Sequence, residues 1–357
     1  MNWTIDKTAR ERAYRQLYRQ IRGDIISGKL PRGTKLPSKR LLADELGISI
    51  ITVEHALALL TDEGCLESRP RSGFYVSFGG LPQQEKRRRP SLSAMQAPPE
   101  APEDFPFALW AKTMRNVLSE YGERILSRVP GTGSPELKSA IADWMARSRG
   151  LSLDPERMII GSGAEYLYSL VAQLLGPGCP VALENPSYEK IRKVYEANGA
   201  VCEWLAMGAD GILSEELERC RAALLHVTPY HSYPSGVTAS AAKKHEYAAW
   251  AKKNGSYLAE DDYDSEFAAG SLPAETLVSL LPEQVIYINS FSKTLAPAIR
   301  TGFMVLPEKL HEKYRQTLDF YSCTVPVFDQ IVLAEFIRGG HLERYVNRRR
   351  RKQRAGL

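Results

Sequence analysis

A proline-rich stretch divides this chain of 357 residues into two parts. The segment GGLPQQEKRRRPSLSAMQAPPEAPEDFP has prolines at positions 82, 90, 98, 99, 102 and 106, and shows neither a helical nor an alternating apolar period. This composition is typical of a partly extended linker. The sequence therefore predicts one domain over residues 1–78, a linker over residues 79–104 and a second domain over residues 105–357.

The charge of the chain follows the same division. Residues 1–90 hold 17 Lys/Arg against 10 Asp/Glu, residues 91–337 hold 22 against 31, and residues 338–357 hold 8 against 1. A basic N-terminal unit joined to an acidic body favours a polyanionic partner for the first and a small-molecule pocket in the second. The alternative is that these charges are simply solvated surface, and charge alone favours this alternative.

Composition and cysteine use argue against several other classes of protein. The N-terminus has no apolar signal region, and no run of about 18 apolar residues could span a bilayer. The sequence therefore predicts a cytoplasmic protein with no membrane partner. The five cysteines are scattered and include no CxxC pair, which indicates neither a disulfide framework nor a zinc site. The six histidines form no ligand set either, so we expect no metal.

Helix and turn signals in the N-terminal part predict three helices and a hairpin. AYRQLYRQIRGDIISG carries one apolar stripe that stops at Gly28. PSKRLLADELG, with Ser38 as its N-cap and Gly47 past its end, is a short second helix, and Ser49 caps a third in ISIITVEHALALLTDEG. CLESRP and FYVSF then form two strands with Gly73 at their turn. Two helices joined by a tight turn predict a helix-turn-helix whose second helix enters a major groove.

The run LPRGTKLPSKRLLADELGISIITVEHALALLTDEGCLESRPRSGFYV resembles the winged helix-turn-helix domain of the GntR regulators along nearly its whole length. The resemblance implies double-stranded operator DNA as a partner. By that resemblance, the expected contacts are Ser38, Lys39 and Arg40 near phosphates, Ser49, Thr52 and His55 at the groove, and Arg69, Arg71 and Gly73 on the wing.

The recognition helix departs from the family pattern in one place. Many GntR relatives carry an arginine after the helix-capping serine, whereas here Ile50 and Ile51 follow Ser49. We therefore expect base recognition to be weaker or to rest on other side chains. A winged helix used only for protein contacts is the alternative.

From about residue 105, helical stretches alternate with short apolar runs, namely RMIIGSG, PVALENP, AALLHVTP, SYLAEDDY, VIYINSFSK and RTGFMVLP. Strands that alternate with helices predict an α/β domain with a mainly parallel sheet covered on both faces. In such sheets the ligand crevice lies at the carboxyl ends of the strands. Polar clusters follow these runs, so the sequence places a candidate site there.

Three of these clusters together supply a phosphate cradle, a carboxylate, a phenol and a lysine. GSGAEYLYSLVAQLL turns at a glycine directly into a helix, so the amides of Gly163 and Ala164 are expected to hold a phosphate at the positive end of the helix dipole. EDDYDSEF offers Asp261 and Tyr263, and SFSKTLAPAIR offers Lys293. Pyridoxal 5′-phosphate (PLP) needs such a set.

Each group has a chemical role toward PLP. A lysine that is neutral often enough to attack an aldehyde can form the Schiff base, and desolvation and a nearby cation favour that state, so Lys293 is predicted to hold the cofactor. Asp261 is expected to stabilise the protonated pyridine nitrogen and Tyr263 to donate to the O3′ oxygen. The phosphate oxygens are expected to be bound by Ser290, Ser292 and Arg300. A surface lysine is the alternative for Lys293.

SFSKTLAPAIRTGFMVLP, EDDYDSEF and ENPSYEKIR resemble the corresponding segments of the class I aminotransferases, which are fold type I PLP enzymes, over residues 105–357. The resemblance implies that Tyr188 stacks on the cofactor ring, with core packing as the alternative, and that the chain forms a homodimer. With its GntR-like head, the chain is identified as a member of the MocR subgroup of the GntR regulators. It is expected to be C-terminally shortened, without the small domain and the arginine that would clamp a substrate carboxylate.

Three functions remain open at this point. The first is a transcriptional regulator that senses PLP, or an amino acid or amine effector, through the aminotransferase-like domain. The second is a working aminotransferase with an accessory DNA-binding head. The third is a DNA-binding remnant whose body no longer binds the cofactor.

Overall fold

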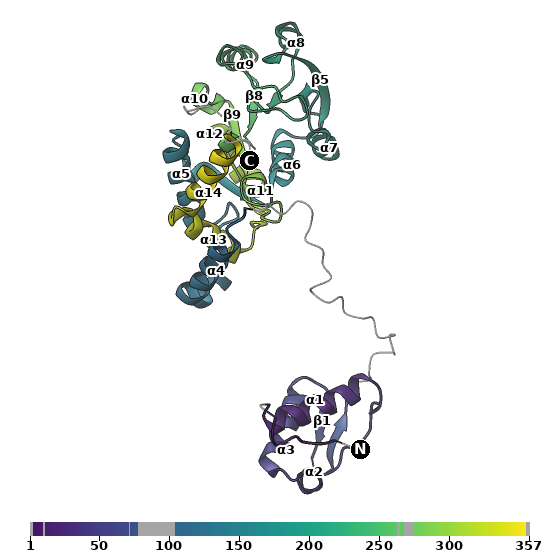
Figure 1. Cartoon of the computed structure of the whole chain (residues 1–357). Helices are drawn as coiled ribbons and strands as arrows, with labels where there is room; N and C mark the ends of the chain where they lie inside the picture. Colours follow the sequence, from purple (N-terminus) through teal and green to yellow (C-terminus); the bar gives the residue numbers. More distant parts are fainter. Residues whose placement is uncertain are drawn as a thin grey trace. The chain divides into compact units, whose positions relative to one another are not determined.

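The computed structural model describes residues 3–9, 11–70, 72–77, 104–262, 265–267 and 275–354. Internal contacts divide the chain into two units, Met1–Gln96 and Ala97–Leu357, each of which is considered by itself (Figure 1). The predicted linker lies outside the described residues except for Asp104. Two candidate site residues, Arg71 and Tyr263, also lie outside them.

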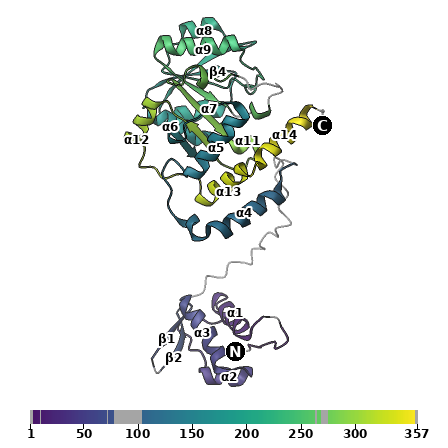
Figure 2. The same cartoon turned by 90° about the vertical axis from the view of Figure 1, so that its left-hand side faces the viewer.

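The first unit is a three-helix domain with a hairpin, shown in Figure 2. Its elements are α1 (Ala13–Ile26), α2 (Lys39–Leu46), α3 (Ile50–Asp62), β1 (Leu66–Arg69) and β2 (Gly73–Val76). The predicted caps are confirmed, because the Ser38 and Ser49 side chains accept hydrogen bonds from the Leu41 and Thr52 amides. Gly47 ends α2 with φ 62°, a left-handed conformation that suits glycine. The predicted helix-turn-helix with an antiparallel wing is therefore present.

The second unit is an α/β domain. Its strands are β3 (Met158–Gly161), β4 (Pro180–Asn185), β5 (Val201–Gly208), β6 (Gly211–Ile212), β7 (Leu224–Val227), β8 (Tyr257–Asp261), β9 (Val285–Ser290) and β10 (Gly302–Val305). Its α-helices are α4 (Phe107–Tyr121), α5 (Pro135–Arg149), α6 (Ala164–Leu175), α7 (Glu189–Ala197), α8 (Ser214–Arg219), α9 (Ala241–Asn254), α10 (Leu277–Leu280), α11 (Phe291–Thr294), α12 (Glu308–Thr317), α13 (Val327–Arg338) and α14 (His341–Arg354). Short 3₁₀ helices are η2 (Gly122–Leu126), η3 (Pro155–Arg157) and η4 (Ser265–Phe267).

The strands form one mixed sheet in the order β3-β10-β9-β8-β7-β4-β5-β6. The centre, from β9 to β5, is parallel, whereas β10 runs antiparallel to both β9 and β3, and β6 runs antiparallel to β5. The predicted mainly parallel sheet is thus confirmed, with antiparallel strands at its edges. Strand β5, which lies between β4 and β6, was not among the expected strands, since its partly exposed side chains interrupt the apolar run that marks the central strands.

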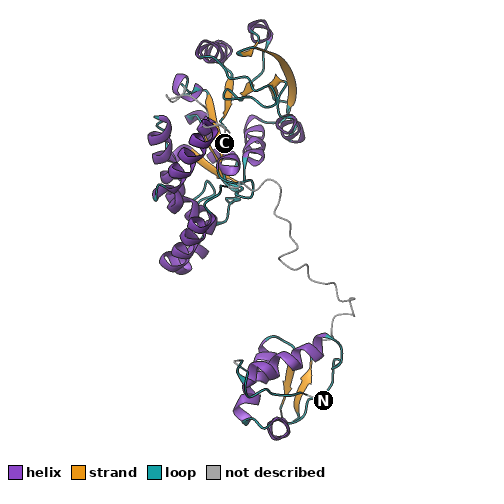
Figure 3. Cartoon of the chain, in the orientation of Figure 1, coloured by secondary structure: helices purple, strands orange, loops and turns teal. Residues whose placement is uncertain are grey.

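Helices cover both faces of this sheet (Figure 3). Successive residues of a strand point to opposite faces, and β3 shows the consequence, because Ile160 packs in one core and Ile159 in the other. One core includes side chains of α5, α9, α13 and α14, and the second includes α6, α7 and α12. In the described part of the chain, no helix is long and apolar enough to cross a membrane.

Candidate functional site

A cavity of about 370 Å³ opens where several parallel strands of the second unit end. The ends of strands β8 and β9 and the segments that follow β4 and β7 supply much of its wall, together with the starts of α6, α7 and α11. Its lining residues are Ala164, Tyr168, Ser187, Tyr188, Ile191, Thr228, Tyr233, Asp261, Ser290, Ser292, Lys293 and Pro297. The structure therefore brings the predicted lysine and aspartate into one space at the predicted edge of the sheet.

Asp261, the last residue of β8, presents an unsatisfied oxygen at this cavity. The side chain is buried, and its Oδ2 accepts a hydrogen bond from the Tyr168 hydroxyl and lies 3.6 Å from His226 Nε2. Its Oδ1 has no hydrogen-bond partner among the described residues. Since a buried carboxylate oxygen without a partner is costly, a ligand that donates a hydrogen bond from the cavity would stabilise it.

Neighbouring side chains hold the Asp261 carboxylate in place. Burial and the charge of Asp261 raise the pKa of Tyr168 well above its usual range, so this phenol stays protonated and donates. His226 is buried on β7, and its Nδ1 lies 3.0 Å from the Tyr195 hydroxyl. These contacts fix one carboxylate oxygen and leave the second for a ligand.

Lys293 lies on α11, a helix that begins directly after Ser290, the last residue of β9. The Lys293 side chain lines the cavity. It makes no hydrogen bond or ion pair with any described residue. Ser292 also lines the cavity, and its hydroxyl donates to the Ile299 carbonyl at 3.2 Å. The lysine is exposed, as the surface interpretation requires, but its exposed side chain borders the same cavity as Asp261.

The glycine turn before α6 is shaped around Arg300. Gly163 has φ +102°, and a Cβ at this position would lie 2.6 Å from Arg300 Nη2, so a larger residue would displace the guanidinium. Arg300 also pairs with Glu165 at 2.6 Å. The Gly163 amide, predicted to hold a phosphate, instead donates to the Gly161 carbonyl at 2.8 Å. The amides of Ala164 and the rest of the first turn of α6 are therefore the better donors.

Tyr188 precedes α7 and is 41% exposed, which rules out the core-packing alternative. It lines the cavity next to Tyr233, with the two rings edge to face at 6.1 Å between centroids. An aromatic side chain in this position is available to stack on a flat ligand.

The sequence analysis missed several side chains of this site. Tyr168, His226 and Thr228 were not singled out, although Tyr168 lies on the helix opened by the glycine turn and the other two lie at the end of β7. Their positions at strand and helix ends were the available signal. Their contacts with Asp261 and the cavity depend on packing between α6, β7 and β8, which the sequence does not display.

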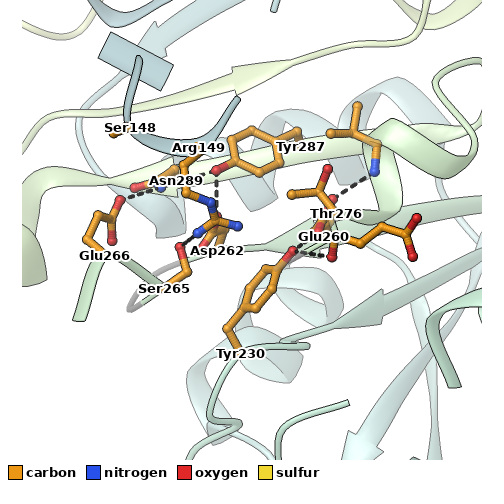
Figure 4. Close-up of polar contacts among 12 residues, drawn as sticks. Ser148, Arg149, Tyr230, Glu260, Asp262, Ser265, Glu266, Thr276, Tyr287 and Asn289 are labelled. Atoms are coloured by element: carbon orange, nitrogen blue, oxygen red, sulfur yellow. Dashed lines mark hydrogen bonds and ion pairs between the residues drawn. The ribbon is translucent and has the colours of Figure 1, made fainter. Parts of the chain in front are cut away.

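A buried polar network supports the segment that follows Asp261 (Figure 4). The Arg149 guanidinium pairs with Asp262 at 3.3 Å, and both side chains are almost wholly buried. The Tyr287 hydroxyl donates to Asp262 at 2.6 Å, and Arg149 also contacts the Ser265 hydroxyl and lies over the Tyr230 ring at 4.9 Å. Asp262 is thus an ion-pair partner of Arg149, and it anchors the chain next to Asp261.

Two acids of this region have raised pKa values. Burial first, and then the charge of Asp262, raise the pKa of Glu266 to about 7. One Glu266 oxygen accepts from Asn289 at 2.9 Å, while the other has no partner among the described residues. Burial likewise raises the pKa of Glu260 to about 7, although the Leu277 and Val278 amides donate to it. The network therefore includes carboxyl groups that change charge near neutral pH.

In the first unit, the predicted DNA contacts lie on the helix-turn-helix and the wing. Lys39 starts α2 and pairs with Glu54 of α3 at 2.9 Å, and Arg40 beside it is exposed. Thr52 shares the cap of α3 with Ser49, their hydroxyls 2.8 Å apart. These residues occupy the ends of α2 and α3 that a phosphate backbone and a groove would meet.

Two further candidates make contacts within the unit. His55 stacks on Tyr14 of α1, with ring centroids 4.2 Å apart, so it faces the first helix as well as solvent. Arg69 on β1 lies over the Tyr75 ring at 4.6 Å, and Gly73 begins β2 after the turn with φ +110°. Arg69 is thus a cation of the wing that rests on an aromatic ring.

Comparison with known families separates the chain into the same two kinds of domain. The model of the bacterial regulatory proteins of the gntR family matches residues 13–76, and that of aminotransferase class I and II matches residues 98–355. The uncharacterized HTH-type transcriptional regulator YdeL of Bacillus subtilis is 34% identical over 96% of this chain and 77% of its own. The probable rhizopine catabolism regulatory protein MocR of Rhizobium meliloti is 30% identical over 97% of this chain and 76% of its own.

Solved structures match the second unit. LysN, the α-aminoadipate aminotransferase of Thermus thermophilus complexed with N-(5′-phosphopyridoxyl)-L-leucine, is 29% identical, with a TM-score of 0.61 over 72% of this chain and 67% of its own. The chain spans less than two thirds of several other aminotransferases of solved structure. The two family matches and the two similar regulators indicate the same family. The chain belongs to the MocR subgroup of the GntR regulators, in which a winged helix-turn-helix is joined to an aminotransferase-like domain of fold type I.

Proposed function

We propose that this chain is a DNA-binding transcriptional regulator whose second domain holds PLP on Lys293 and responds to PLP itself or to an amino compound. One observation carries the proposal. In a chain that begins with a helix-turn-helix, the unpartnered Asp261 Oδ1 and the Lys293 side chain border the same cavity. Among the described residues, one Asp261 oxygen has no donor and Lys293 has no ion pair, and these two groups fit opposite sides of a pyridoxal ring.

Each residue of the cavity has a defined task in this proposal. Asp261 accepts from the pyridine nitrogen, Lys293 provides the amine for the covalent attachment, and Tyr188 covers one ring face. The phosphate is assigned to the residues at the helix starts and strand ends, namely Ala164, Ser290, Ser292 and Arg300, with Gly163 giving Arg300 room to approach. When bound, PLP supplies an aldehyde that reacts with amines and a ring that withdraws electrons. Tyr263 keeps its predicted role as donor to O3′, outside the described residues.

Regulation requires that the ligand distinguish two states of the protein. A ligand shifts an equilibrium only by its difference in affinity for the two states, so PLP or its amino-compound adduct must change the affinity of the head for DNA. We further propose a homodimer acting in the cytoplasm on paired half-sites, because two-fold symmetric regulators match the symmetry of their operators. The domain boundaries at residues 78 and 105 are part of the same proposal.

The covalent attachment is tested by the visible absorbance of the purified protein. Full-length protein reconstituted with PLP should be yellow, and Lys293→Ala should lose the band because its side chain has no amine. Lys313→Ala on α12 is the matched control, since Lys313 is exposed and does not line the cavity. A Lys293→Ala protein with an unchanged band would refute the assignment.

The regulatory role is tested by mobility shift of DNA from upstream of the chain's own gene, with and without PLP. We expect binding that weakens steeply with salt, as phosphate contacts require, and an affinity that changes when PLP is added. Absence of binding at low salt in both conditions would contradict the DNA-binding role. Many turnovers of an amino acid without any retarded DNA would instead establish the competing aminotransferase function.

A further inference from the structure

The start of the recognition helix exposes two large apolar side chains. Ile50 is 43% exposed and Ile51 is 77% exposed, while the core of the same helix is formed by Val53, Ala56, Leu57 and Leu60. Ile50 and Ile51 therefore contribute little to the folded core. An isoleucine exposed to water gains no free energy from burial. Two such residues at the start of the helix therefore indicate a surface that binds a partner.

Basic residues lie on α2, on the segment before α1 and near the turn that precedes this apolar pair. Lys39 of α2 pairs with Glu54, one turn beyond Ile50 on α3. The Lys7 amine approaches the turn between the two helices, 3.5 Å from where a Cβ at Gly47 would stand. Arg40 is exposed on α2. Basic residues on the same unit as an exposed apolar pair fit a partner that is anionic at its edges and apolar in its middle.

The major groove of DNA has that chemistry. Phosphates line its rims, and within the groove the C5-methyl group of thymine is the apolar feature that distinguishes one base from the others. Arginine at this place would select the acceptors of guanine, whereas isoleucine offers no hydrogen bond and only a surface for a methyl group.

We propose that Ile50 and Ile51 read thymine methyl groups, so that each operator half-site carries thymine where the start of α3 meets the major groove. This inference rests on the proposed DNA-binding function and replaces the expectation that base recognition is weak or rests elsewhere. The Ser49 cap and its Thr52 partner fix the first turn of α3, which holds the two side chains in a defined direction.

Uracil in place of thymine tests the proposal directly, because the two bases differ only by the methyl group. Duplexes that bind the full-length chain are first selected from a random library, and each thymine of the selected half-site is then replaced by deoxyuridine. We expect one or two replacements to weaken binding by about threefold to fivefold each, the factor for one buried methyl group. Duplexes with 5-methylcytosine at those positions should bind more tightly than duplexes with cytosine, because only the former carry the methyl group.

Variants assign the effect to the side chains. Ile50→Ala combined with Ile51→Ala should bind the thymine and uracil duplexes equally, while Leu41→Ala should keep the difference, since Leu41 is similarly exposed but lies on α2. All three residues are exposed, so thermal melts should match that of the parent protein. Ile50→Arg should shift the selected base toward guanine.

Two outcomes would overturn the inference, and they differ from failure of the proposed function. If no uracil replacement weakens binding, or if the difference persists in the double alanine variant, the isoleucines do not read methyl groups. If the library yields no bound duplex even at low salt, the DNA-binding function itself fails.

Discussion

At the scale of single residues, the second domain depends on a few polar atoms at strand ends. Asp261 has one oxygen held by Tyr168 and one without a partner in the described chain, and Lys293 shares its cavity. A buried acceptor without a donor among the described residues is unfavourable. That cost is offset when a ligand donates a hydrogen bond to this oxygen. Substitution of Asp261 is therefore a direct test of the cofactor assignment.

Asp261→Asn keeps the shape of the side chain and removes its charge. Because a neutral amide does not stabilise a protonated pyridine nitrogen, we expect at least about tenfold weaker PLP binding, the factor for roughly 1.4 kcal/mol. The measurement is a fluorescence or absorbance titration with PLP. The matched variant is Asp154→Asn at the surface-exposed start of η3, which should bind as the parent does. Equal affinities for Asp261→Asn and the parent would exclude contact with the ring nitrogen.

The raised pKa of Glu266 leads to a prediction of how the stability of the fold depends on pH. Its pKa is raised to about 7 from an ordinary 4.5, so between these values the folded protein holds more protons at this carboxyl than the unfolded chain does. Stability therefore falls as pH rises through this window. Glu266→Gln should flatten the dependence of the melting temperature over about pH 5 to 7, with Glu260 keeping its own contribution.

The control for this experiment is Glu312→Gln, an exposed carboxyl of α12. It should leave the slope unchanged. A Glu266→Gln protein with the full slope of the parent would show that the raised pKa of Glu266 does not contribute to stability in this range.

At the scale of elements, helix starts and strand ends position the functional groups. Ser38 and Ser49 cap α2 and α3 and so fix the two helices of the DNA-binding motif. Strands β8 and β9 run in parallel and end at Asp261 and Ser290, which brings their following segments to the same edge of the sheet. The caps were predictable because they depend on residues three apart in the sequence.

Loss of the α3 cap should weaken the first unit alone. Ser49→Ala removes the acceptor for the Thr52 amide and should lower the free energy of unfolding of this unit by about 1 kcal/mol. Ser49→Asp should restore most of it, since a carboxylate accepts the same bond. Ser68→Ala on the exposed strand β1 serves as the control. Unchanged denaturant midpoints for Ser49→Ala would mean that the cap contributes nothing.

At the scale of the whole molecule, the chain consists of two units, each with its own hydrophobic core. The first core gathers α1, α2, α3 and the wing, and the cores of the second unit lie on either side of its sheet. Each unit is therefore expected to unfold as its own cooperative transition.

Calorimetry of the full chain should resolve these two transitions, and PLP should move only one of them. Ligand at about one hundred times its dissociation constant stabilises the unit that binds it by about 2.7 kcal/mol. We expect the transition of the aminotransferase-like unit to rise and that of the head to stay. In Lys293→Ala the rise should shrink, and a shift confined to the head would contradict the assigned cofactor site.

Local signals in the sequence determined much of this protein. Spacing of apolar residues, caps at Ser38 and Ser49, and polar clusters after strands gave the helix-turn-helix, the α/β domain and the residues Asp261 and Lys293, because each depends on near neighbours along the chain. The sequence also showed isoleucine where relatives carry arginine, although their exposure emerged only from the fold.

Tertiary structure alone decided the partners of these residues. It placed Tyr168 and His226 against Asp261, paired Arg149 with Asp262, turned the Gly163 amide toward Gly161 and set β10 antiparallel between β3 and β9. These contacts join segments on different elements, many of them far apart in the sequence, and depend on how strands are ordered in the sheet. Strand order is set by burial of the whole sheet, a property that no local pattern encodes.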